Sequence, residues 1–152
     1  MLLLMERTLV LIKPLGLQNT LLDILRALKS VGTIVERRLV PVSSERIAAH
    51  YAEHAARPWF GKIVGYYERQ TVMALVLEGP DIIARLRGIV GPSDPRKAAP
   101  GQIRALVLAK FQDKKDGWRA IELVTSGVDN FIHASDSSEA AEREIALWFS
   151  RG

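Results

Sequence analysis

Four short runs of apolar residues stand out along the chain, separated by longer segments of mixed polarity. Residues 7–13, 33–40 and 71–77 are rich in Leu, Val, Ile and Thr, and each is followed closely by Pro. Runs bounded by residues that break regular structure are typical of strands. A fourth run, Phe131-Ile132-His133, lies much later in the chain. The pattern predicts three early strands and one late strand.

The segments between these runs carry apolar residues three and four positions apart, which places them on one face of a helix. The predicted helices are 21–28, 45–55, a stretch that ends at Gln70, 81–90, and a last helix that buries Ala141, Ile145, Trp148 and Phe149. Ser43 or Ser44 can cap the second helix, and Asp136, three residues before Glu139, is a variant of the capping pattern for the last one. Residues 91–101 carry three prolines and no apolar period, which predicts a loop.

The order β-α-β-α-β-α-β predicts an α+β fold, a ferredoxin-like antiparallel four-stranded sheet with helices packed on one face. The chain has 152 residues, of which 48% are hydrophobic, enough to enclose one core. We therefore expect one domain over residues 1–152, without repeats or linkers.

The composition excludes some classes of site and favours others. The absence of cysteine excludes thiolate zinc sites and cysteine nucleophiles, and it favours the cytoplasm. Glu6 and Arg7 interrupt the apolar start too early for an export signal, and no apolar run is long enough to span a bilayer. The net charge of +4 suits an anionic ligand, although a solvated surface with a small cationic excess explains it equally well.

Three histidines are candidates for chemistry: His50, His54 and His133. The first two are four residues apart on a predicted helix, a spacing that can hold a metal, but Tyr51 follows where a metalloprotease has a catalytic glutamate. We predict no metal site there. His133 ends a strand just before a helix N-terminus, where amide groups favour phosphate, and its largely neutral imidazole can act as a nucleophile. A lone histidine is more often structural than catalytic, so a catalytic role for His133 requires other residues that can act with it.

Several separated blocks of the sequence supply such residues. They are Arg7-Thr8 with Lys13-Pro14-Leu15-Gly16, then His50-Tyr51-Ala52-Glu53, then Arg57-Pro58-Trp59-Phe60, then Asn130-Phe131-Ile132-His133-Ala134-Ser135-Asp136-Ser137, and finally Glu139 with residues 142–149. In order and spacing these blocks resemble the nucleoside diphosphate kinase family, and the last ones are similar to its signature around a phosphorylated histidine. The resemblance runs from Glu6 to Phe149 with one gap.

The resemblance implies a ping-pong enzyme that moves the γ-phosphate of a nucleoside triphosphate to a nucleoside diphosphate through a phosphohistidine. It also implies a role for each of ten side chains. These are His133 as nucleophile, Glu144 to orient its imidazole with Ser135 bonded to Glu144, Lys13, Tyr51, Arg87, Ser93 and Arg104 toward the ribose and phosphates, Phe60 stacked on the base and Asn130 at the sugar. Lys13 and Tyr51 count among the catalytic residues as well. Cationic side chains suit this chemistry because phosphoryl transfer spreads negative charge over oxygens.

The same resemblance implies that Mg²⁺ is held mainly by the phosphates of the nucleotide. It also implies a homo-oligomer, a hexamer or tetramer built from dimers. A glycine-rich P-loop is absent, in keeping with the different phosphate site of this family.

The chain departs from the family pattern at a few positions. Leu15 replaces the usual aspartate, Asn19 stands where arginine is common, and Ala134 replaces a common glycine. Leu15, Asn19 and an extra segment support one alternative, a catalytically silent member that acts as a binding or scaffolding subunit. A nucleic-acid-binding module is a further alternative, but the paired aromatic motif on central strands is absent.

The extra segment lies between Arg104 and Asn130 and is roughly sixteen residues longer than the family spacing. Its runs 105–111 and 118–124 are apolar, and Asp116-Gly117 between them suits a turn. We predict a β-hairpin that modifies the oligomer or the rim of the site. A helix over 118–124 stays open, because the periodicity does not exclude it.

Overall fold

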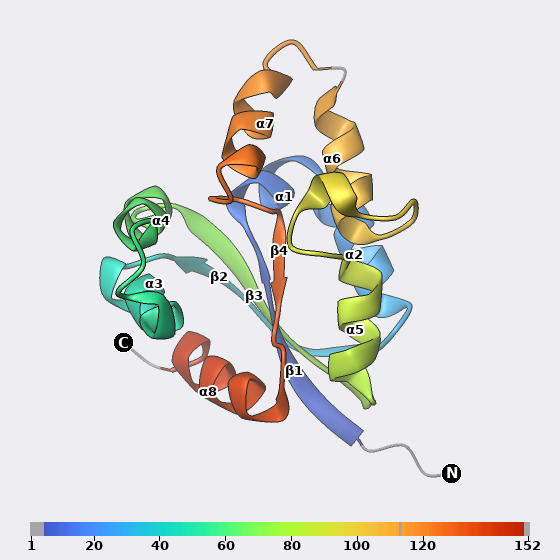
Figure 1. Cartoon of the computed structure of the whole chain (residues 1–152). Coiled ribbons are helices and arrows are strands. Elements are labelled where there is room, and N and C mark those ends of the chain that lie inside the picture. Colours follow the sequence, from blue (N-terminus) through green and yellow to red (C-terminus); the bar gives the residue numbers. More distant parts are fainter. Residues whose placement is uncertain (1–4, 113, 151–152) are drawn as a thin grey trace.

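Four strands form one antiparallel sheet in the order β2-β3-β1-β4 (Figure 1). The computed structural model describes residues 5–112 and 114–150. The strands are β1 (Met5–Ile12), β2 (Thr33–Pro41), β3 (Thr71–Pro80) and β4 (Ile132–Ala134). Strand β1 lies in the centre, and its residue Leu11 is opposite His133 of β4. The predicted α+β class and ferredoxin-like sheet are confirmed.

Helices cover both faces of this sheet, so the prediction of a single covered face is wrong (Figure 1). One face packs against α1 (Pro14–Asn19), α2 (Leu21–Lys29), α5 (Ile82–Val90), α6 (Ile103–Gln112) and α7 (Gly117–Thr125). The other packs against α3 (Ser44–His50), α4 (Phe60–Tyr67) and α8 (Ser138–Trp148). Among the residues described, no helix is both long and apolar enough to cross a bilayer.

The unbroken apolar run in β1 is the physical reason for the two covered faces. Successive side chains of a strand point to opposite faces of its sheet. Leu9 and Leu11 therefore face one core, Val10 and Ile12 face the other, and all of them are buried. A strand that is apolar on both sides needs a layer of helices on each.

The caps and breaks explain most differences from the predicted boundaries. Helix α1 is not among the predicted helices, but Pro14 occupies its first turn, where proline is tolerated. The predicted helix 45–55 ends as α3 at His50 and continues as a short 3₁₀ turn, Ala52–His54. Ser43 caps α3, because its hydroxyl accepts from the amide of Arg46 at 3.1 Å.

Helix α8 begins one residue later than the capping pattern indicated. The hydroxyl of Ser137, rather than Asp136, accepts from the amide of Ala140 at 3.1 Å. The loop 91–101 contains one 3₁₀ turn, Pro95–Lys97. Helix α8 follows β4 in the sequence, and the loop 91–101 lies near it in space. Both elements therefore help to fix the position of His133.

The extra segment forms two helices, α6 and α7, and the predicted β-hairpin is wrong. Ile103, Val107 and Phe111 recur every four residues and are buried in the core. Ala120 and Val124 do the same in α7. Residues four positions apart lie on one face of a helix, but a strand would also place them on one face, so this spacing fits both elements. The helix that stayed open for 118–124 is the correct interpretation.

Candidate active site

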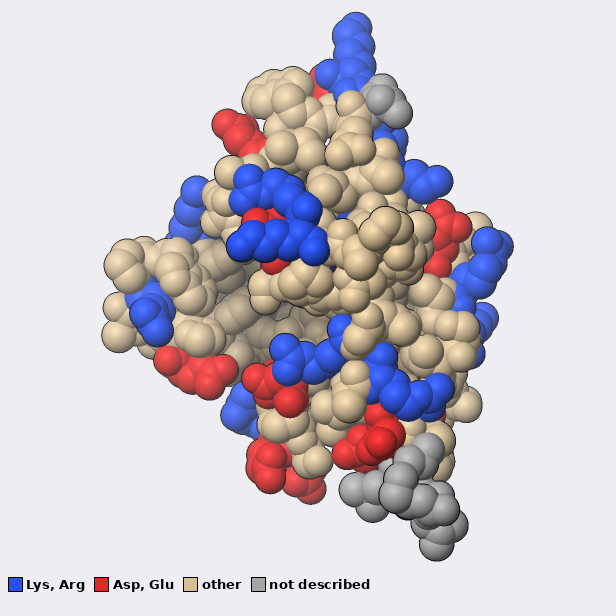
Figure 2. Space-filling model, turned by 45° about the vertical axis from the view of Figure 1, so that its right-hand side comes forward, with Lys and Arg blue, Asp and Glu red and all other residues tan. Residues whose placement is uncertain are grey.

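A cleft of about 360 Å³ opens between α4, the end of α7 and strand β4. Figure 2 shows this side of the molecule hollowed, with Lys and Arg side chains above and below the hollow. Six of the residues predicted for the site line the cleft, namely Lys13, Tyr51, Ser93, Arg104, Asn130 and His133. Segments far apart in the sequence therefore meet in one place.

His133 is held by a carboxylate at the back of the cleft. Its Nε2 lies 2.8 Å from Oε1 of Glu144, on α8, and the hydroxyl of Ser135 donates to the same oxygen at 2.6 Å. The amide of Leu9 in β1 donates to Ser135 at 3.3 Å. A central strand, a strand end and a helix thus fix the imidazole together.

The charge of Glu144 decides which nitrogen of His133 carries the proton. Burial alone raises the pKa of Glu144, but the hydrogen bonds from His133 and Ser135 and the charge of His133 lower it below its ordinary value. An ionised carboxylate only accepts hydrogen bonds, so Nε2 of His133 carries the proton. Nδ1 then keeps a free lone pair. The arrangement can therefore perform nucleophilic catalysis with an oriented imidazole.

A second histidine packs against the first. The rings of His50 and His133 lie 4.6 Å apart at 81°, and Nε1 of Trp148 donates to Nδ1 of His50 at 3.0 Å. Burial, followed by the charge of His133, lowers the pKa of His50 to about 3. His50 is therefore neutral near pH 7, with its proton on Nε2.

These bonds decide whether the cluster can hold a metal. His50, His133 and Glu144 bring ligand atoms within 4.8 Å of one another. A metal ligand must offer a free lone pair, but in His50 Trp148 occupies one nitrogen and a proton occupies the other. The pair of His133 and Glu144 is likewise bonded internally. The cluster fits an oriented nucleophile better than a metal centre.

Two cationic side chains of the cleft differ in how many hydrogen-bond donors they have left for a ligand. The ammonium of Lys13 donates to Oδ1 of Asn130 at 2.7 Å and has two further protons. Arg104 donates to four backbone carbonyls, those of Gly91, Pro92, Asn130 and Ile132, at 2.6–3.1 Å. Its guanidinium keeps one N–H for a ligand. Burial lowers the pKa of Arg104 to about 10, which leaves it charged at neutral pH.

The remaining predicted residues lie at the mouth of the cleft or beside it. The side-chain amide of Asn130 donates to the carbonyl of Ser93 at 2.8 Å, which ties the loop 91–101 to the strand region. Arg87 lines a neighbouring cavity with Gly91 and Asp136 and does not line the cleft. Its exposed side chain stands one helix away from Arg104.

At the start of α4, the aromatic residue that lines the cleft is Trp59, the neighbour of the predicted Phe60. Phe60 was predicted to stack on a base, but it does not line the cleft, whereas its neighbour Trp59 does. The ring of Trp59 lies 6.4 Å from that of Tyr51. Lys62, also missed, lines the same wall one helical turn after Trp59, a spacing that puts both on one side of α4. That spacing was the signal in the sequence.

Residues 126–128, at the end of the extra segment, form the wall of the cleft and were also missed. The end of the extra segment therefore lies at the cleft, and its effect on the oligomer or on the rim of the site stays a prediction. Backbone geometry explains two residues of the matched blocks. Ala134, which departs from the family pattern, has an ordinary negative φ and therefore needs no glycine. Gly16 is required because a Cβ there would lie 2.8 Å from the carbonyl oxygen of Phe131.

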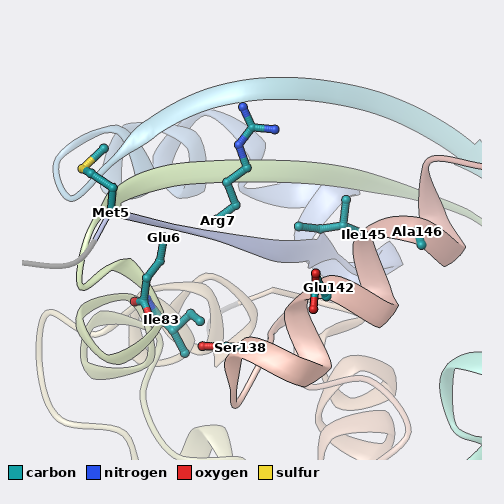
Figure 3. A pocket seen from close by; sticks show the side chains of 8 residues that line it. All are labelled: Met5, Glu6, Arg7, Ile83, Ser138, Glu142, Ile145 and Ala146. Carbon is teal, nitrogen blue, oxygen red and sulfur yellow. The ribbon is translucent and has the colours of Figure 1, made fainter.

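A larger cavity, of about 600 Å³, lies away from this cluster (Figure 3). Its walls are the start of β1 and one side of α8, with Arg7 pointing away from Ile83 and Ser138. Arg7 forms an ion pair with Glu78 at 2.8 Å. The cavity contains none of the predicted site residues, so its size does not make it the candidate site.

Comparison with known proteins decides the family. The family model described as nucleoside diphosphate kinase matches residues 6–152. The chain belongs to the nucleoside diphosphate kinase family. It is 43% identical to the nucleoside diphosphate kinase of Mycobacterium sp. (strain MCS) over 147 residues, covering 95% of this chain and 96% of the relative. The enzyme of Moorella thermoacetica is 42% identical, with 95% and 94% covered.

Solved structures agree with this family. The Aquifex aeolicus nucleoside diphosphate kinase superposes with a TM-score of 0.76 at 33% identity, covering 97% of this chain and 96% of that one. The Babesia bovis family member gives 0.76 at 31% identity, with 95% and 88% covered. The chain is thus a nucleotide-binding phosphotransferase of the nucleoside diphosphate kinase family.

Proposed function

We propose that the enzyme transfers the γ-phosphate of a nucleoside triphosphate to a nucleoside diphosphate through a phosphohistidine on His133. In the first half-reaction Nδ1 attacks the γ-phosphorus, the N–P bond forms, and the bond to the β-phosphate oxygen breaks. In the second, a terminal oxygen of the acceptor diphosphate attacks the same phosphorus and frees the imidazole. The observation that carries this proposal is the 2.8 Å bond between His133 Nε2 and Glu144, which leaves Nδ1 as the basic nitrogen.

The cleft residues stabilise the charge of the phosphates in this proposal. Lys13, Arg104 with its one remaining N–H, Tyr51 and Ser93 act on the phosphate and ribose oxygens, and Asn130 acts at the sugar. Arg87 approaches from the neighbouring cavity. Fixed donors aimed at the equatorial oxygens lower the barrier, because phosphoryl transfer gathers negative charge there. Trp59 takes the role of the base-stacking residue that the sequence assigned to Phe60.

Mg²⁺ enters this scheme with the nucleotide. Within the described residues, the cleft lining contains no carboxylate, so the cleft itself offers no set of hard oxygen ligands for a resident ion. The ion supplies charge neutralisation on the phosphates when the nucleotide is bound. A single domain, assembly as a hexamer or tetramer of dimers and a cytoplasmic location remain part of the proposal.

Labelling of the protein tests the mechanism directly. After incubation with γ-labelled ATP and Mg²⁺, the chain is expected to carry label that is acid-labile and alkali-stable, as a phosphohistidine is. His133→Asn should lose both the label and the transfer to a diphosphate, while circular dichroism shows an intact fold. His54→Asn is the matched control, because His54 does not line the cleft and should leave the label in place. A wild-type chain that takes up no such label refutes the mechanism and leaves the binding or scaffolding subunit as the better account.

A further inference from the structure

Asp129 is a buried carboxylate that the proposed mechanism does not use. It is fully buried, and no ion pair involves it within residues 5–112 and 114–150. It accepts three hydrogen bonds instead: Oδ2 from the amide of Leu15 at 3.1 Å and from the hydroxyl of Tyr66 at 2.6 Å, and Oδ1 from the amide of Phe131 at 2.9 Å. A buried charge held by neutral donors is costly unless each bond is made, so its position is tightly determined.

Two of the three donors belong to separate elements beside the cleft, and the third, the amide of Phe131, lies two residues from Asp129 in the sequence. Leu15 is in α1, directly after Pro14 and Lys13, and Tyr66 is in α4, the helix that carries Lys62. The backbone amide of Asp129 itself donates to the carbonyl of Leu123 in α7 at 3.3 Å. One carboxylate therefore connects α1, α4 and the end of the extra segment.

The neighbours of Asp129 in the sequence are cleft residues. Val128 lines the wall, and its carbonyl accepts from the hydroxyl of Tyr67 at 3.2 Å. Asn130 accepts from Lys13 and donates to the loop 91–101. A shift of Asp129 would therefore move both a wall of the cleft and the partner of its lysine.

The tyrosine bond is a strong one. Burial, and then the charge of Asp129, raises the pKa of Tyr66 above its ordinary value, so the phenol stays protonated and remains a donor. The hydroxyl-to-carboxylate distance of 2.6 Å is in the range of charge-assisted hydrogen bonds. Leu15 stands where the family usually has an aspartate. In this chain the carboxylate of Asp129 accepts a hydrogen bond from the Leu15 amide.

We propose that Asp129 is a positioning residue for nucleotide binding: the hydrogen bonds that its carboxylate accepts from Leu15 and Tyr66 hold α1 and α4 next to residues 126–128, in the arrangement that forms the nucleotide cleft. This inference rests on the proposed function only in taking the cleft to be the nucleotide site. Asp129 touches no reacting atom, so it acts on affinity rather than on the transfer step.

The Asp129→Asn variant separates positioning from simple charge. Asp129 is an anion behind an anion-binding cleft, so removing its charge should by Coulomb's law alone tighten the binding of ADP. Asparagine offers one oxygen in place of two, and in either orientation its NH₂ group faces a backbone amide N–H. Positioning therefore predicts weaker binding, about tenfold in the Kd for ADP, the loss expected for a bond to a charged acceptor.

Titration calorimetry with ADP measures this Kd, and single-turnover labelling by ATP measures KM and the maximal rate. Asp129→Asn should raise Kd and KM together while the maximal rate of labelling changes little. The matched control is Asp23→Asn, the same chemical change on an exposed carboxylate of α2 that pairs with Arg26, and it should leave Kd unchanged. Tyr66→Phe removes one of the three bonds and should weaken ADP binding in the same direction by a smaller factor.

Tighter or unchanged binding by folded Asp129→Asn overturns the inference. If that variant does not fold, Tyr66→Phe decides, and an unchanged Kd there overturns it as well. The inference and the proposed function fail in different ways. A wild-type chain that binds ADP but takes no label refutes the phosphohistidine mechanism only. If the chain is labelled but Asp129→Asn leaves the Kd for ADP unchanged, the positioning role alone is refuted.

Discussion

Glu144→Gln isolates the charge of the residue that holds the nucleophile. Both short hydrogen bonds, from His133 Nε2 and from the Ser135 hydroxyl, go to the same oxygen, Oε1. A glutamine can keep a carbonyl oxygen there and accept both bonds, so the geometry is retained. The other oxygen is 3.9 Å from an exposed arginine, Arg143, and its replacement by NH₂ has little effect because solvent screens that pair.

The expected loss follows from the difference between charged and neutral acceptors. A hydrogen bond to a charged group contributes about 1.5–3 kcal/mol and one between neutral groups about 0.5–1.5 kcal/mol. The imidazole gains positive character as Nδ1 bonds to phosphorus, so the carboxylate stabilises the transition state more than free His133. A difference of about 1.4 kcal/mol corresponds to a tenfold slower phosphorylation of the enzyme.

Single-turnover labelling with γ-labelled ATP, quenched on the millisecond scale, measures this rate, and ADP calorimetry serves as the control for binding. The rate should fall about tenfold while the Kd for ADP stays within twofold. A variant that phosphorylates at the wild-type rate would falsify the role given to the carboxylate charge. A fall in rate matched by an equal loss of ADP affinity would also refute the reasoning, because it would mean that the cleft itself had changed.

The same variant has a pH dependence with a defined sign. The pKa of Glu144 is below its ordinary value of 4.5 in the folded chain. A carboxyl group whose pKa falls on folding contributes stability above its ordinary pKa and loses it as the pH falls through the folded pKa. The difference in unfolding free energy between wild type and Glu144→Gln should therefore be constant at neutral pH and shrink below about pH 4.5 in urea titrations.

Two further pairs of substitutions test the aromatic residue of the cleft and the extra segment. Trp59→Ala should raise the Kd of ADP, GDP, CDP and UDP by similar factors, about tenfold or more, because stacking reads no base edge. The control variant Phe60→Ala should leave the four Kd values unchanged. A strong preference for one base in calorimetry would contradict this prediction. Phe111→Ala removes a buried ring stacked 5.8 Å from Phe131 and should lower the unfolding free energy by about 3–5 kcal/mol, while Leu106→Ala, at an exposed position of the same helix, should change it by less than about 0.5 kcal/mol in denaturant titrations.

The strands and long helices followed from the sequence because their patterns are unambiguous. Residues 7–13 form an apolar run that Pro14 ends, as expected of a buried strand, and the leucines of 21–28 recur at a clear helical spacing. The runs 105–111 and 118–124 are too short for the pattern to choose between elements, because a mainly apolar run of seven residues that no proline or glycine divides fits either a strand or two turns of helix. The choice depends on distant contacts, such as that of Phe111 with Phe131, which no local pattern contains.

The site was predicted unevenly for a similar reason. Residues joined to a dense motif, such as His133 and Ser135, lie together because the motif spans one strand end and its loop. Trp59 and Phe60 are adjacent where α4 starts, and neighbours on a helix point about 100° apart, so only one of them can face the cleft. Which one does depends on how the helix packs on the sheet.

The departures from the family pattern meet around the extra segment. Asn19 accepts from Lys114, in the turn between α6 and α7, at 3.0 Å, and its own amide donates to the carbonyl of Leu15 at 2.9 Å. Leu15 in turn donates to Asp129 at the far end of that segment. The hypothesis of a silent subunit drew its support from these same features. Because each of them has a partner in the cleft wall, in the first turn after Lys13 or in the turn between α6 and α7, we interpret them as one adjusted set rather than as separate losses from a catalytic site.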